Sequence, residues 1–206
     1  MEHGLKNNSS TINHNRRTPF WIDFATSTSL ILGATEVIVG LKLGGGNTVL
    51  ANSVEMLDNG TYALDSMAAR SESNRKRNHR LRRLAGGLIC AASLYVATNS
   101  TYDLIENHNP EVSPIFALFT STATVINGSY ALGLNRHAQI GTTHRDAFRH
   151  ASADTISSAI ATNSIILSTQ GLPSLNNWTG LVLSIWTIGM TYPTKKRIEA
   201  ADKHYK

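Results

Sequence analysis

The sequence has little charge and almost no cysteine. Of its 206 residues, 16% are Asp, Glu, Lys or Arg, and one, Cys90, is a cysteine. An ordinary soluble domain carries about 25% charged residues. The single cysteine excludes a disulfide framework and any zinc site built from several thiolates. Mean hydropathy is slightly negative, which is low for a membrane protein with several spans, so the distribution of the charges must decide between the two classes.

Long stretches of the chain contain no charged residue. Residues 84–102, 112–135 and 155–194 are free of charge over 19, 24 and 40 positions. A helix needs about 20 residues to cross the roughly 30 Å hydrocarbon core of a bilayer. A cluster of Gly, Pro and Asn at 170–177 divides the longest stretch in two. We therefore predict an all-α fold, a bundle of six transmembrane helices. Their approximate ranges are 20–43, 47–70, 81–106, 113–135, 143–169 and 175–197.

The predicted helices are rich in Ser, Thr, Asn and Ala rather than in Leu and Phe. Small and hydroxylated residues are usual where transmembrane helices touch each other, because they allow close approach. They are poor surfaces toward lipid. The sequence therefore predicts extensive helix–helix contact within the bundle.

Lys and Arg occur in alternate connections between the predicted helices. They occupy the N-terminal segment, the second and fourth connections and the C-terminus, whereas the connections 44–47, 106–113 and 170–177 contain neither. Because basic residues collect in short cytoplasmic loops, both termini are predicted to be cytoplasmic. The expected location is the cell membrane, with several spans, or the inner membrane of a bacterium.

The predicted organisation has three parts. Residues 1–19 are expected to be a disordered polar tail, because they contain no apolar core of the kind found in a signal peptide. Residues 20–197 are expected to form the membrane domain, and residues 198–206 a short C-terminal tail.

The Arg-rich stretch 70–83 permits a second interpretation. A soluble or peripheral basic helical bundle could bind acidic partners through it without any transport. Nucleic acid is not an expected partner, because no aromatic residues alternate with the basic ones for base stacking. The sequence contains no phosphate loop, no dinucleotide fingerprint, no His-Glu-x-x-His and no Gly-x-Ser-x-Gly motif. We therefore predict that the protein is not an enzyme.

Ionisable residues fall inside two of the predicted spans. Glu55, Asp58 and Asn59 lie on the second helix at spacings of three and four, so they share a face. His150 and Asp154 lie one turn apart on the fifth helix. Ionisable groups within a membrane are costly, and the default interpretation is functional. Two such helices side by side would present carboxylate oxygen and imidazole nitrogen ligands to one divalent cation, Zn²⁺ first and Cd²⁺, Co²⁺, Mn²⁺ or Fe²⁺ as alternatives.

Other polar residues in the spans have simpler interpretations. We expect Glu36, Asp65 and Asp103 to form hydrogen bonds between helices or to lie at helix ends. Asn127 and Asn163 are expected to form polar contacts between helices.

The segments that carry these residues resemble those of a known family. The string His150-Ala151-Ser152-Ala153-Asp154-Thr155-Ile156-Ser157-Ser158 is similar to the His-x3-Asp motif of the cation diffusion facilitator family. The segment Leu50-Ala51-Asn52-Ser53-Val54-Glu55-Met56-Leu57 resembles the opening of that family's second helix. The similarity extends over about residues 20–195, and Glu36 and the six-span topology also fit it.

The resemblance implies a secondary transporter that exports a divalent cation in exchange for protons, usually as a homodimer in the lipid bilayer. The cation is its substrate and no cofactor is implied. By this resemblance His150 and Asp154 match the ligands of the fifth helix, and Glu55 matches the first ligand of the second. The next position, normally Asp, is Asn59, so either Asn59 or its neighbour Asp58 supplies the remaining ligand. After the sixth helix we expect only the short C-terminal tail, without the cytoplasmic metal-sensing domain that many members of the family carry.

The residue types predict how metal and protons would be coupled. Unperturbed carboxyl groups titrate near pH 4 and imidazole near pH 6.5. His150 is therefore the candidate ligand best able to exchange a proton near neutral pH. Because metal ligands must be deprotonated, metal and protons would compete for the same atoms.

Overall fold

The computed structural model describes residues 20–68, 75–135 and 142–203, and within them the chain forms six α-helices and no strand. The helices are α1 (Phe20–Leu43), α2 (Gly46–Ala68), α3 (Arg75–Ile105), α4 (Ile115–Asn135), α5 (Thr142–Thr169) and α6 (Ser174–Lys203). The description excludes the side chains of residues 20–23, 25–26, 59–68, 75–82, 142–147, 150 and 192–203. The predicted all-α fold of six helices is confirmed, whereas the predicted tail at 1–19 lies outside the described residues.

Two helices are longer than the sequence predicted. Helix α3 begins at Arg75 rather than at residue 81, and α6 continues to Lys203 rather than ending at 197. The prediction placed each of these helix ends inside a charged segment. Arg, Lys, Glu and Ala are good helix formers, so the helices continue through these charged segments. Residues 198–203 are therefore helical rather than part of a tail.

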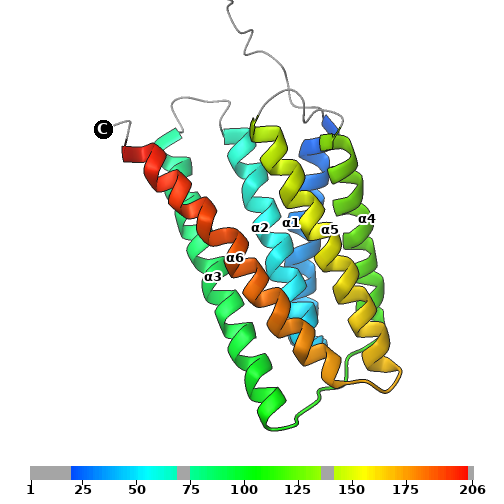
Figure 1. Ribbon diagram of the computed structural model, residues 1–206. Helices are drawn as coiled ribbons and strands as arrows, with labels where there is room; N and C mark the ends of the chain where they lie inside the picture. Colours follow the sequence, from blue (N-terminus) through cyan, green and yellow to red (C-terminus); the bar gives the residue numbers. More distant parts are fainter. Residues whose placement is uncertain (1–19, 69–74, 136–141, 204–206) are drawn as a thin grey trace, which may run out of the picture.

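The helices run up and down in two groups (Figure 1). Helices α1 and α5 each contact both α2 and α4, so these four form one group, and α3 and α6 lie side by side as a pair. The pair packs against α2, and α6 also contacts α5. Helix α2 contacts all five other helices, so its side chains form the centre of the molecule.

The two ends of the bundle differ in charge. The connections at residues 44–45, 106–114 and 170–173 lie at the lower end in Figure 1 and contain no Lys or Arg. We call this the Arg-free end; its nearest basic residue is Lys42 in the last turn of α1. The other end contains the start of α3 and the C-terminal part of α6, both rich in Lys and Arg, and we call it the basic end.

The distribution of polar residues is the reverse of that in a soluble domain. Among the described side chains, 22 polar or charged residues are buried, against 16 apolar ones. Large apolar side chains are exposed instead on α1, α3, α4, α5 and α6, including Leu94 at 61%, Leu132 at 70% and Ile156 at 61%. In water, polar residues are mostly exposed and Leu and Ile are mostly buried. The outer surface is therefore apolar and the interior polar.

Hydroxyl groups on the outer faces are satisfied within their own helices. The hydroxyls of Thr28, Thr35, Thr98 and Thr122 each donate to the carbonyl four residues earlier, at 2.8 to 2.9 Å. Such local bonds present methyl groups outward and hide the polar atom. This explains how helices rich in Thr can have outer faces that suit an apolar environment.

Length and composition alone support one of the six predicted spans. Within the described residues, α4 is the single helix long and apolar enough to cross a membrane by these criteria. Helices α2, α3, α5 and α6 contain more Ser, Thr, Asn and ionisable residues than α4, and many of those side chains are buried between helices. Average hydropathy does not distinguish residues that face outward from residues that face a neighbouring helix.

Candidate functional site

Two acidic side chains meet between α2 and α5. The carboxyl groups of Glu55 and Asp154 form a hydrogen bond with each other, and the carboxyl group of Glu55 is also hydrogen-bonded to Ser157. Both acids are buried, at 4% and 3% exposure. Asp154 and Ser157 are three residues apart on α5, so one helical face supplies both contacts. We call Glu55 and Asp154 the carboxyl pair.

The carboxyl pair lies well inside the bundle. Glu55 is nine residues from the start of α2, which places it about 13 Å from that end at 1.5 Å per residue. Asp154 is twelve residues from the start of α5, or about 18 Å from the opposite end of the bundle. The pair is therefore near mid-height.

A third acid is directed at a different helix. Asp58 is one turn along α2 from Glu55 and is buried at 5% exposure. Its Oδ2 accepts a hydrogen bond of 3.2 Å from the hydroxyl of Thr191 on α6. It still lies close enough for its charge to act on Glu55. Asp58 therefore adds negative charge beside the pair while it is bonded to α6.

Glu36 forms a separate polar contact between α1 and α2. Its Oε2 accepts hydrogen bonds from Asn52 Nδ2 at 2.9 Å and from the hydroxyl of Ser53 at 3.2 Å. Gly33, one turn earlier, allows the two helices to approach, because a Cβ there would lie 2.9 Å from the Cβ of Met56. The predicted role of Glu36 in a hydrogen bond between helices is confirmed.

The metal ligands predicted from the sequence are only partly brought together in the structure. The structure brings Glu55 and Asp154 together and places Asp58 nearby. The side chains of Asn59 and His150 lie outside the described residues, so the choice between Asp58 and Asn59 stays open. Within the described side chains, no group of three or more His, Cys, Asp or Glu residues is arranged to hold a metal ion.

The carboxyl pair has an oxygen acceptor that its hydrogen bonds leave without a partner. An ionised carboxylate only accepts hydrogen bonds, so a bond between two carboxyl groups requires a proton on one of them. Within the described residues, Oε2 of Glu55 is buried and has no hydrogen-bond partner. A buried acceptor without a partner costs about 1–3 kcal/mol, and more when it is charged. The pair therefore retains a buried oxygen acceptor that no described protein group satisfies.

Sequence reasoning missed two neighbours of the acids. Ser157 was read only as part of a motif, although its spacing of three from Asp154 placed it on the same face. Thr191 carried no signal, because nothing in the sequence indicates which residue of α6 faces Asp58.

The two asparagines predicted to join helices have different positions. Asn127 accepts a hydrogen bond from Ser29 on α1 and donates one to Ser158 on α5, each 3.4 Å long. The prediction for Asn163 was wrong. Its side chain is exposed and donates to the carbonyl of Ala159 in its own helix, at 2.8 Å. Because the Asn163 side chain is exposed, the available acceptor is a backbone carbonyl of its own helix. The side chain of Asp65 lies outside the described residues.

No protein-family model matches the chain, and no curated protein matches it. The resemblance to the cation diffusion facilitator family therefore rests on the His-x3-Asp motif, the second-helix segment and the topology predicted from the sequence.

Proposed function

We propose that this chain is a membrane protein with six spans that exports a divalent metal cation in exchange for protons. The observation that carries the proposal is the meeting of Glu55 and Asp154 at mid-height between α2 and α5. Zn²⁺ is the preferred substrate, and Cd²⁺, Co²⁺, Mn²⁺ and Fe²⁺ are alternatives that oxygen and nitrogen ligands also accept.

The surface of the bundle supports placement in a membrane. Large apolar side chains are exposed on five helices, including α5 and α6, which contain more polar residues than α4. Tyr102 and Trp178 are exposed near the Arg-free end, at 61% and 54%, and aromatic residues of this kind are enriched where a helix leaves the hydrocarbon core. The basic end would face the cytoplasm, because Lys and Arg collect on that side.

Protons and metal would compete at the carboxyl pair. Metal binding requires deprotonated ligands, so a cation entering from the basic end displaces the proton shared by Glu55 and Asp154. A proton arriving later from the other side helps to displace the metal. His150, one turn from Asp154 on α5, is the proposed nitrogen ligand and a second carrier of protons near neutral pH. Asp58 or Asn59 would complete the ligand set.

Flux into vesicles tests the proposal directly. The purified protein is reconstituted in liposomes, and uptake of Zn²⁺, Cd²⁺, Co²⁺, Mn²⁺ and Fe²⁺ is measured with and without a pH gradient. We expect Zn²⁺ flux that depends on the gradient and is lost in Glu55→Gln and in Asp154→Asn. The matched control is Glu36→Gln, which removes another buried carboxyl group but can still accept hydrogen bonds from Asn52 and Ser53.

Each result of the flux assay has a defined meaning. Flux that survives in both pair variants would refute the assigned site. Equal loss in Glu36→Gln would show that any buried carboxyl group is needed for folding, and would remove the support for the pair.

Extraction tests the membrane placement separately. Washing membranes at alkaline pH removes peripheral proteins but leaves proteins that span the bilayer. We expect the chain to stay in the membrane fraction. Release by the wash would instead support a soluble or peripheral bundle that binds acidic partners through its basic residues.

A further inference from the structure

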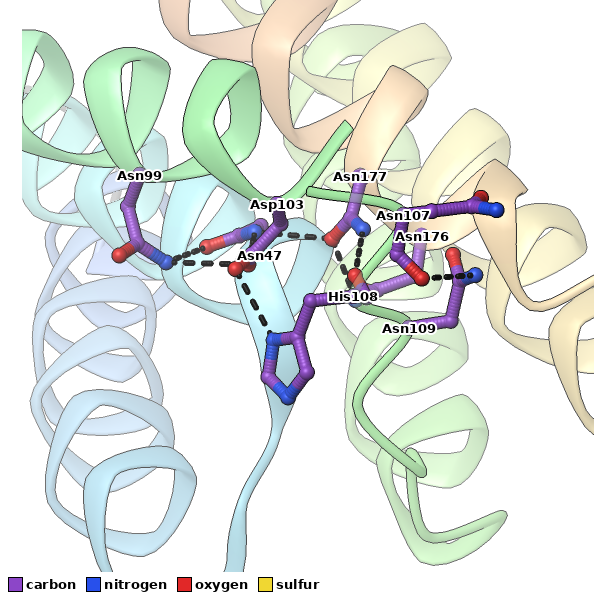
Figure 2. A network of polar contacts seen from close by, with 8 residues as sticks. All are labelled: Asn47, Asn99, Asp103, Asn107, His108, Asn109, Asn176 and Asn177. Atoms are coloured by element: carbon purple, nitrogen blue, oxygen red, sulfur yellow. Dashed lines mark hydrogen bonds and ion pairs between the residues drawn. The ribbon is translucent and has the colours of Figure 1, made fainter. Parts of the chain in front are cut away.

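A second polar cluster lies at the Arg-free end, where Figure 2 shows amide and acidic side chains from three helices pointing toward one another. We call Asn47, Asn99, Asp103, His108, Asn176 and Asn177 the amide network. Asn47 on α2 donates to Asp103 Oδ2 on α3 at 2.8 Å and to Asn177 Oδ1 on α6 at 2.9 Å. Asn99 on α3 donates to Asn47 Oδ1 at 2.8 Å and to Asp103 Oδ2 at 3.3 Å.

Further bonds fix α6 to α2 and to the loop after α3. Asn176 Oδ1 accepts from the backbone N–H of Thr48 at 3.1 Å, and its backbone carbonyl accepts from the Thr48 hydroxyl at 2.6 Å. Asn177 Nδ2 donates to the carbonyl of His108 at 2.8 Å. The network therefore holds together the ends of α2, α3 and α6.

The end of α3 directs His108 back toward the network. Asn107 has a positive φ of 56°, and the N–H of His108 donates to the carbonyl of Asp103 at 2.8 Å. This is the usual helix ending in which a left-handed residue turns the chain and the next N–H reaches back over the last turn. It places His108 Nδ1 at 3.0 Å from Asp103 Oδ1. Asp103 is thus contacted on one oxygen by amides and on the other by an imidazole.

The helices approach closely at this end. A Cβ added to Gly180 on α6 would lie 2.6 Å from the Cβ of Asn47 and 2.9 Å from the hydroxyl of Ser100. A Cβ on Gly46 would lie within 3.0 Å of the Asn176 amide group. A side chain at either position would therefore clash, so α2, α3 and α6 approach one another closely around the amide network.

The pair of Asp103 and His108 connects this closed interior to water. The side chain of Asp103 is 7% exposed, whereas that of His108 is 67% exposed. The other ionisable residues at this end, Lys42, Glu106 and Glu111, are exposed. The groups that α2 and α6 direct toward the pair are neutral amides, so His108 is the titratable partner that faces Asp103.

We propose that His108 and Asp103 form a proton-binding site that strengthens closure of the Arg-free end. An imidazole side chain gains a positive charge when it takes up a proton. A protonated His108 attracts the buried carboxylate of Asp103, and the bond tightens the loop against α3 and, through Asn177, against α6. The stabilisation is therefore present when His108 carries a proton and lost when it does not. The direction in the cell rests on the proposed function, which takes this end to face outside.

Hydrogen exchange measures closure without any need for transport. The full-length protein in detergent is compared at pH 5.5 and 8.0, with exchange corrected for its intrinsic dependence on pH. The amides that report are those of residues 46–50 and 174–180, at the start of α2 and α6. In the wild type we expect the opening equilibrium constant to be about three to ten times smaller at pH 5.5, the size of effect expected for a hydrogen bond to a charged but partly exposed group.

Three variants show which residue causes any dependence of the opening equilibrium constant on pH. His108→Gln keeps a polar side chain in an exposed position and should leave opening independent of pH. Asp103→Asn keeps one oxygen acceptor for the amides and should also be independent of pH. Glu106→Gln removes an exposed charge from the same turn and should behave as the wild type. Should Asp103→Asn not fold, His108→Gln decides alone.

Two results would overturn the proton site. One is opening in the wild type that does not change between pH 5.5 and 8.0. The other is a full dependence on pH that persists in His108→Gln. Because exchange is measured without metal, failure of metal flux would refute the proposed transport and leave this result intact. A flat response would refute the proton site even in a protein that transports Zn²⁺.

Discussion

The carboxyl pair and the amide network are both buried and polar, but they satisfy their hydrogen bonds differently. In the network, Asn47, Asn99, Asp103 and Asn177 form several mutual bonds of 2.8–3.3 Å. In the pair, Glu55 retains an oxygen with no hydrogen-bond partner in the described residues. A satisfied network makes a structure rigid, whereas a buried polar group without a partner is costly and needs another explanation. This difference is the reason for the two proposals, in which the network strengthens closure and the pair binds a cation.

The largest effect should follow from removing the proposed nitrogen ligand. We expect His150→Ala to lower Zn²⁺ flux in liposomes by about a hundredfold, because loss of groups that support a metal commonly costs 10–100-fold and a direct ligand matters at least as much. Thermal unfolding in detergent should change little. Unchanged flux would discard the assignment of His150 and leave the carboxyl pair without imidazole.

A smaller effect should separate the two candidates on the second helix. Asp58→Asn removes a charge that acts on Glu55 but keeps an acceptor for Thr191. We expect it to weaken Zn²⁺ binding about tenfold, which corresponds to about 1.4 kcal/mol, measured by titration calorimetry. Asn59→Ala is the comparison variant. If Asn59→Ala has the larger effect, Asn59 supplies the ligand and Asp58 acts only through its bond to α6.

The close approach at the Arg-free end predicts a change in stability rather than in binding. Gly180→Ala introduces a Cβ that would lie 2.6 Å from the Cβ of Asn47. Overpacking of this kind costs about 1–3 kcal/mol, and it should lower the thermal unfolding midpoint and loosen residues 174–180. Gly87→Ala on α3 is the control, because a Cβ there meets nothing within 4 Å. Equal effects of the two substitutions would show that α2 and α6 are not in close contact.

The smallest predicted effect compares two asparagines. Asn127→Ala removes bonds to both α1 and α5, and we expect it to lower the free energy of unfolding by about 1–2 kcal/mol. Asn163→Ala removes a bond within its own exposed helix face and should change it by less than about 0.5 kcal/mol. Chemical unfolding of both variants in the same detergent checks the difference, and a larger loss for Asn163→Ala would contradict the arrangement of α5.

Most of the fold followed from the sequence because charge marks the helix ends. The Gly, Pro and Asn cluster at 170–177 correctly divided a charge-free stretch of 40 residues. Helix ends within charged segments did not follow, since Arg and Lys continue a helix as readily as they end a span. The sequence predicted from ligand types and a family resemblance that Glu55 and Asp154 lie close together. In the structure their carboxyl groups are hydrogen-bonded.

Of the amide network, the prediction that Asp103 bonds to another helix is confirmed, and the rest was missed because no other residue in it has an unusual type or spacing. The sequence does show several asparagines at the three connections without Arg. They predict a network only when α2, α3 and α6 are known to lie beside one another. The error at Asn163 has a related cause. Helical periodicity shows which residues share a face of α5, but it does not show whether a partner helix covers that face.

The central position of α2 determines how copies of the chain would behave together. Its described side chains, from Gly46 to Asp58, are all buried or half-buried, and the contacts of Glu55 and Asp58 come from α5 and α6 of the same chain. Under the proposed function, each copy would therefore hold its own metal site, even if two copies associate. Mixing wild-type protein with an inactive variant before reconstitution should therefore reduce activity in proportion to the inactive fraction, without dominant inhibition.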